Sequence, residues 1–102
     1  MEKVYSYTIT DQEIFENIFK EEKLLMNHAV VPAGKVFPRH PTDAIVYALI
    51  VRGELSLTIE DQETKIFKEG QLVNIPKGTD SELGNRGNDP LEIFVVKYEY
   101  EK

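Results

Sequence analysis

The chain has no cysteine and no tryptophan among its 102 residues. The lack of cysteine excludes disulfide bonds, thiolate metal sites, iron–sulfur clusters and a cysteine nucleophile, and it favours a cytoplasmic location. Basic residues are also scarce, because 12 Lys and Arg stand against 18 Asp and Glu and leave a net charge of −6. Phosphate backbones are bound by clustered cations, so we expect no nucleic-acid partner.

Long apolar runs are missing as well. The longest uninterrupted run, residues 44–51, is too short to cross a bilayer, and no charged-then-apolar leader opens the chain. We therefore expect no membrane association. What is present is an ordinary globular composition, 41% hydrophobic and 29% charged, of a length that suits a single domain over residues 1–102.

Glycine and proline recur at short intervals after residue 30 and separate runs rich in β-branched and aromatic residues. Such punctuation is typical of an all-β sandwich or barrel. Strands are predicted over residues 24–31, 46–51, 55–59, 64–67, 72–75 and 91–98. In the first of these, alternation gives two faces, and we expect the bulkier one to point inward; it consists of Leu24, Met26, His28 and Val30.

The N-terminal segment, residues 1–23, has a different pattern. Val4–Ile9 alternates apolar and polar residues and is predicted as a strand. Thr10 or Asp11 can cap a helix that follows, and its apolar face consists of Ile14, Phe15, Ile18 and Phe19. We expect this short helix to cover an end or edge of the barrel, with binding of a partner protein as the alternative.

The spacing of seven residues resembles the two signature motifs of the cupin superfamily. The first motif is Gly, five residues, His, one, His, three, Glu, six, Gly; the second is Gly, five residues, Pro, one, Gly, two, His, three, Asn. The matching positions here are Gly34, His40, Gly53, Gly70, Pro76, Gly78 and Asn85. The resemblance covers residues 24–98 and implies an antiparallel jelly-roll barrel, with residues 1–23 forming the preceding strand and helix.

In cupins, the histidines and glutamate of these motifs hold a divalent metal. Carried onto this sequence, the first ligand position is His40, and the other three are Thr42, Val46 and Ser81. Valine has no donor atom, and hydroxyl groups are poor ligands for transition metals. We therefore expect no bound metal and no other cofactor.

The resemblance and the strand alternation together predict a ligand pocket inside the barrel. Its predicted residues are His28, His40, Thr42, Val46 and Ser81. A purely structural role stays open for both histidines: His40 as a hydrogen-bond donor within the pocket, and His28 as a packed strand residue.

The function that this pattern favours is a metal-free barrel that binds or senses a small molecule, with no catalytic residue assigned. Residues 53–78 also resemble the effector-binding domains of arabinose-type transcription regulators. One alternative is a small enzyme, an isomerase, epimerase or metal-dependent oxygenase, that uses His40 with His28 or Tyr47. Another is a structural role in which the barrel has collapsed around Val46.

We also expect a homodimer, because a small open barrel leaves strand edges to cover. The predicted interface is either the segment Val4–Ile9 or the strand Leu91–Tyr98.

Overall fold

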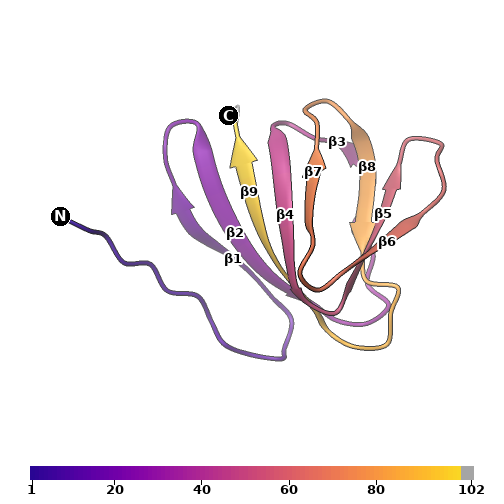
Figure 1. Cartoon of the computed structure of the whole chain (residues 1–102), viewed down its shortest axis with the longest axis horizontal. Helices are drawn as coiled ribbons and strands as arrows, with labels where there is room; N and C mark the ends of the chain where they lie inside the picture. The colour runs from indigo at the N-terminus through magenta and orange to yellow at the C-terminus, as the bar shows by residue number, and fades with distance from the viewer. Residues whose placement is uncertain (100–102) are drawn as a thin grey trace.

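The computed structural model describes residues 1–99, which form nine strands and no helix (Figure 1). Within this range there is accordingly no helix long and apolar enough to cross a membrane. In chain order the strands are β1 (Ile14–Lys20), β2 (Leu24–Val31), β3 (His40–Pro41), β4 (Ile45–Arg52), β5 (Glu54–Ile59), β6 (Lys65–Lys68), β7 (Leu72–Ile75), β8 (Asp80–Gly84) and β9 (Leu91–Tyr98). The prediction of an all-β fold is confirmed.

The strands form two antiparallel sheets that face each other. One sheet has the order β1-β2-β9-β4-β7, and the other has the order β3-β8-β5-β6. Figure 1 shows the two layers side by side, with the last strand, β9, in the middle of the larger sheet. Because β9 pairs with β2 on one side and β4 on the other, it offers no free edge to a partner strand, contrary to the expectation for Leu91–Tyr98.

Strand alternation places the core between the two sheets. In β4, Val46, Ala48 and Ile50 are buried, whereas Tyr47 and Leu49 on the opposite face remain exposed. The buried β4 residues meet residues from the smaller sheet, and together the two inner faces form a continuous apolar interior. The alternation of apolar and polar residues therefore predicted strand β4 correctly.

The predicted helix is wrong, because residues 14–20 form strand β1. This strand pairs with β2 from Ile14 opposite Val30 to Lys20 opposite Leu25. A bulge between Asn17 and Phe19 inserts an extra residue into the strand, which breaks strict alternation and produces a spacing that imitates a helical face. Ile and Phe favour strands, and pairing with β2 outweighs the weak local preference for helix.

The predicted strand Val4–Ile9 is also wrong in part. The segment is extended, but it joins neither sheet and lies along the outer face of the larger sheet (Figure 1). Tyr5 packs against Phe19 of β1, with ring centroids 5.4 Å apart. We refer to residues 1–13 as the N-terminal arm.

The inward face of β2 is the opposite of the predicted one. Register with β1 and β9 places Ala29 opposite Phe15 and Ile93, on the inner face, and sends His28 outward. Both faces of β2 are buried, since the N-terminal arm covers the outer one: His28 is 0% exposed and Ala29 is 2% exposed. Side-chain bulk therefore gave no indication of which face pointed into the barrel.

The turns at Gly53 and Gly70 have positive φ angles of 79° and 89°. The two glycines differ in their surroundings. A Cβ at Gly53 would lie 2.3 Å from the carbonyl oxygen of Pro90, whereas a Cβ at Gly70 would have no atom within 4 Å. The first turn therefore requires glycine for both conformation and space, and the second for conformation alone.

We accordingly expect Gly53→Ala to lower the free energy of unfolding by about 3 kcal/mol, because it combines left-handed strain with a backbone clash. The matched control Gly70→Ala carries only the strain and should cost about 1 kcal/mol. Urea unfolding monitored by circular dichroism measures both. Equal losses in the two variants would contradict the clash at Pro90.

Candidate functional site

A cavity of about 460 Å³ lies between the inner faces of the two sheets. Its walls are mostly apolar, and they come from both layers. The apolar lining includes Ala29, Val46, Leu55, Ile75, Leu83, Leu91, Ile93 and Val95. Sites for small molecules are typically concave, apolar spaces of this size that contain a few placed polar groups. The barrel has therefore not collapsed around Val46.

Strand β9 gives the cavity a polarity along its length. Four of its residues, Leu91, Ile93, Val95 and Lys97, line the cavity because every second side chain points inward. The first three are apolar, and the fourth carries an ammonium group at the end of the strand where β4 begins. One end of the cavity is thus apolar and the other is polar.

Four predicted pocket residues, His40, Thr42, Val46 and Ser81, line this cavity. They come together because β3 pairs with β8, which sets His40 directly opposite Ser81. Ser81 is 0% exposed, and its hydroxyl oxygen has no hydrogen-bond partner among the described residues. Buried hydroxyl groups are normally paired, so this one is an exception among the residues of the cavity wall.

Thr42 has a structural role, because its hydroxyl group already makes two hydrogen bonds to backbone groups. Thr42 Oγ1 donates to the carbonyl oxygen of Pro76 at 2.9 Å and accepts from the N–H of Thr79 at 3.2 Å. Its own backbone N–H and carbonyl also bind the 78–79 turn. Thr42 therefore fastens the start of β4 to the turn before β8, and it does not pair with Ser81 across the site.

His40 lines the cavity and is also exposed to solvent. Its Nδ1 lies 3.0 Å from the carbonyl oxygen of Pro38, and because a carbonyl only accepts, this nitrogen carries the proton. The other ring nitrogen, Nε2, is left for a ligand or solvent. The structural role that was left open for His40, that of a hydrogen-bond donor, is thus filled by Nδ1.

Three polar residues of the cavity were not predicted: Asn27, Asp43 and Lys97. Asn27 was missed because the opposite face of residues 24–31 was expected to point inward. Lys97 could have been found, since it continues the alternation of Leu91, Ile93 and Val95. Lys97 Nζ lies 3.4 Å from Asp43 Oδ1, so the two charges form an ion pair at the polar end.

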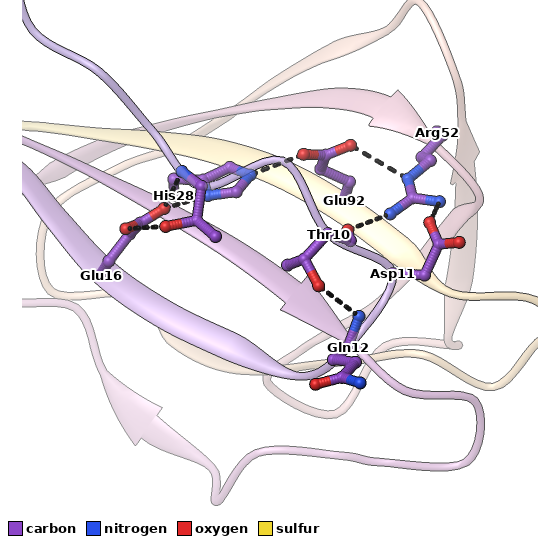
Figure 2. A network of polar contacts seen from close by, with 8 residues as sticks. Thr10, Asp11, Gln12, Glu16, His28, Arg52 and Glu92 are labelled. Carbon is purple, nitrogen blue, oxygen red and sulfur yellow. Dashed lines mark hydrogen bonds and ion pairs between the residues drawn. The ribbon is translucent and has the colours of Figure 1, made fainter.

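His28 does not line the cavity; this part of the predicted pocket is wrong. Figure 2 shows its ring on the outer face of the larger sheet, held between two glutamates. Nδ1 lies 2.8 Å from Glu16 Oε2, and Nε2 lies 2.6 Å from Glu92 Oε2. Tyr7 of the N-terminal arm covers the ring with its centroid 4.9 Å away, and Phe94 packs at 4.8 Å. His28 is a packed strand histidine, the alternative left open for it.

The cluster around His28 anchors the N-terminal arm. Glu92 bridges from His28 to Arg52 Nε at 3.0 Å, and the Arg52 guanidinium donates to Asp11 Oδ1 at 2.6 Å (Figure 2). The hydrogen bond to Asp11, followed by that to Glu92, raises the pKa of Arg52. Hydrogen bonds from the Thr8 N–H and then from His28 lower the pKa of Glu16.

The sequence profile of the cupin domain, of the cupin 2 type, matches residues 27–97. The chain belongs to the cupin family. This small cupin is 36% identical over 103 residues to the uncharacterised protein MJ0764 of Methanocaldococcus jannaschii, covering 100% of this chain and 89% of that one. The uncharacterised protein MJ1618 of the same organism is 29% identical over 104 residues, covering 95% and 82%.

Solved structures agree with this membership. The crystal structure of MJ0764, described as an RmlC-like cupin with a double-stranded β-helix fold, superposes with a TM-score of 0.92, covering 98% of this chain and 93% of that one. The Schizosaccharomyces pombe Cnp3 cupin domain, 23% identical, superposes with a TM-score of 0.80 over 92% of this chain and 69% of that chain, which shows a shared fold.

The residues of this cupin do not fit the divalent metal that its family implies. Among residues 1–99, no group of three or more His, Asp or Glu side chains is placed to hold a metal ion. Of the motif positions, only His40 has a metal-binding side chain; Thr42 Oγ1 is occupied by backbone groups, and Val46 has no donor. His28 cannot supply a second imidazole, because it lies on the far side of the sheet.

The lowered pKa of Glu16 predicts how the stability of the folded protein depends on pH. Because the folded state holds this pKa below its usual 4.5, the folded protein gains stability at higher pH and loses it as the pH falls from about 4.5 through the lowered value. Glu16→Gln should therefore lower the urea midpoint at pH 7, and its deficit relative to the unmodified protein should shrink as the pH falls below about 4.5, so that it is smaller at pH 3.

The exposed Glu22, in the turn after β1, provides the control: Glu22→Gln should leave the midpoint unchanged at both pH values. A deficit for Glu16→Gln that stays constant down to pH 3 would contradict the proposed contribution of its carboxylate.

Proposed function

We propose that this cupin binds a small, largely apolar molecule in its cavity without a metal ion. The observation that carries the proposal is an apolar cavity of about 460 Å³ whose lining includes Ser81, a residue whose buried hydroxyl has no partner among the described residues. A buried hydroxyl without a hydrogen-bond partner lowers the stability of the folded protein. A bound molecule that forms this hydrogen bond would remove that cost.

The size and walls of the cavity indicate the kind of molecule. A cavity of about 150 Å³ accommodates benzene, so this one has room for a ring with substituents. Apolar walls favour a hydrocarbon body over a sugar or nucleotide, whose hydroxyl and phosphate groups would lose their hydration without replacement. Binding of this kind serves a sensor as well as a carrier, and the cysteine-free composition supports a cytoplasmic setting.

The enzymatic alternative has less support. An acid–base mechanism needs two titratable groups facing one substrate. Neither pair considered from the sequence meets this condition, because His28 lies on the outer face and Tyr47 projects away from the cavity, 39% exposed. His40 would have to act with Lys97 or Asp43, which already pair with each other.

Binding can be tested with 3-phenylpropanamide, an uncharged apolar probe, by titration monitored in amide ¹H–¹⁵N spectra. We expect the shifts to concentrate around the cavity, at Val46, Ile75 and Leu83. Val46→Phe should weaken binding at least tenfold, because the added ring occupies the cavity, whereas Leu49→Phe, on the outward face of the same strand, should not.

Val46→Leu provides a milder filling should the phenylalanine variant fold poorly, and it should give an intermediate loss. Undiminished binding in a folded Val46→Phe variant, or shifts located away from the cavity, would overturn the proposal.

We further propose that the protein forms a homodimer through the outer face of its larger sheet. Leu49 of β4 lies directly opposite Leu72 of β7, and with Tyr47 they form an exposed, uncharged patch, 39–62% exposed. Two molecules that each carry a net charge of −6 repel one another least where they meet without charge. A second copy is therefore the occupant that fits this patch, in an isologous pairing.

Light scattering after size exclusion should give twice the chain mass of 11.7 kDa. Leu49→Glu sets like charges against each other at the interface and should yield the monomer, whereas Ile66→Glu, an equally exposed position on β6 of the other sheet, should leave the dimer intact. A monomer in the unmodified protein at micromolar concentration would refute this assembly.

A further inference from the structure

We infer that the cavity selects a molecule with a single carboxylate group, which displaces Asp43 from Lys97. The inference rests on the proposed small-molecule binding and names the chemical class of the ligand. It starts from the polarity of β9, whose inward side chains change from apolar at Leu91, Ile93 and Val95 to a cation at Lys97. A ligand that follows this gradient has an apolar body and an anionic end.

The existing partner of Lys97 is a weak one. The two groups are 3.4 Å apart, and the Asp43 side chain is 53% exposed, so solvent screens the pair. Lys97 itself is only 28% exposed and belongs to the inward row of β9. A carboxylate that arrives from inside the cavity meets the ammonium group in less water than Asp43 does, so it competes favourably for it.

The charged side chains at the polar end of the cavity suit a ligand with a single negative charge. Lys97 is the single lysine or arginine side chain that lines the cavity within the described part of the chain, and Asp43 stands beside it. A phosphate dianion would be repelled by Asp43 and would lack the several donors that phosphate sites provide. A carboxylate needs one cation and a few donors.

Two further donors are available for oxygens of the same ligand. Asn27 accepts from Asn17 Nδ2 through its Oδ1 at 3.0 Å, which leaves its NH₂ group to face the cavity. The Ser81 hydroxyl is the second donor, on the opposite sheet. Both groups suit an acid that carries a carbonyl or hydroxyl oxygen in addition to its carboxylate.

Three probes of one shape test the inference: 3-phenylpropionate, its amide 3-phenylpropanamide and the amine 3-phenylpropylamine. Dissociation constants are measured by ¹H–¹⁵N titration at pH 7 and low salt. We expect the acid to bind about tenfold more tightly than the amide, since a hydrogen bond to a charged partner contributes that much. The amine should bind no better than the amide.

Three variants then locate the effect. Lys97→Met should abolish the preference for the acid and leave the affinity for the amide within twofold. Asp43→Asn should strengthen binding of the acid several-fold, because it removes the competing carboxylate. Lys65→Met, at an exposed position on β6, should change neither constant.

Equal binding of acid and amide, or a preference for the acid that survives in Lys97→Met, would overturn the inference while leaving the proposed function in place. Tighter binding of the amine than of the acid would assign the polar end to Asp43 and also overturn it. If none of the three probes bound in the cavity, the proposed function itself would fail.

Discussion

The alternation of side chains along the paired strands β2, β9 and β4 is the constraint on which the rest of this structure depends. Because β9 is hydrogen-bonded on both sides, its register fixes those of its two neighbours. A shift of one residue would exchange the two faces of every strand, bringing His28 inside and turning Lys97 outward. The cavity, the anchored arm and the exposed patch are all consequences of this one register.

The two faces of the larger sheet carry different kinds of polar chemistry. On the outer face the polar side chains are hydrogen-bonded to one another, because His28 lies between two glutamates and Arg52 extends the network to the N-terminal arm. On the inner face the polar groups are few and incompletely paired: the Ser81 hydroxyl has no partner among residues 1–99, and Lys97 has a partially exposed ion pair with Asp43. Complete pairing stabilises a fold, and incomplete pairing leaves groups available for a ligand.

The side chains at the family's metal-ligand positions give the interior of this barrel a chemistry different from that of a metal site. Val46 and Ser81 still face the interior, and Thr42 now ties together the turn that precedes β8. The interior is an apolar cavity with one polar end. Such a cavity suits recognition of a molecule by shape and a single charge, which is the basis of the function proposed above.

The sequence by itself determined six of the nine strands, the glycine turns, the loss of ligating side chains at three of the four metal positions, and four of the residues that line the cavity. Those features follow from period-two patterns, positive-φ turns and the motif spacing, all of which are local. Only the tertiary structure decided that residues 14–20 form a strand, that His28 faces outward and that Asn27 faces inward. Each of these depends on pairing with a distant segment, and the N-terminal arm buries the outer face of β2 so thoroughly that hydrophobicity no longer distinguishes inside from outside.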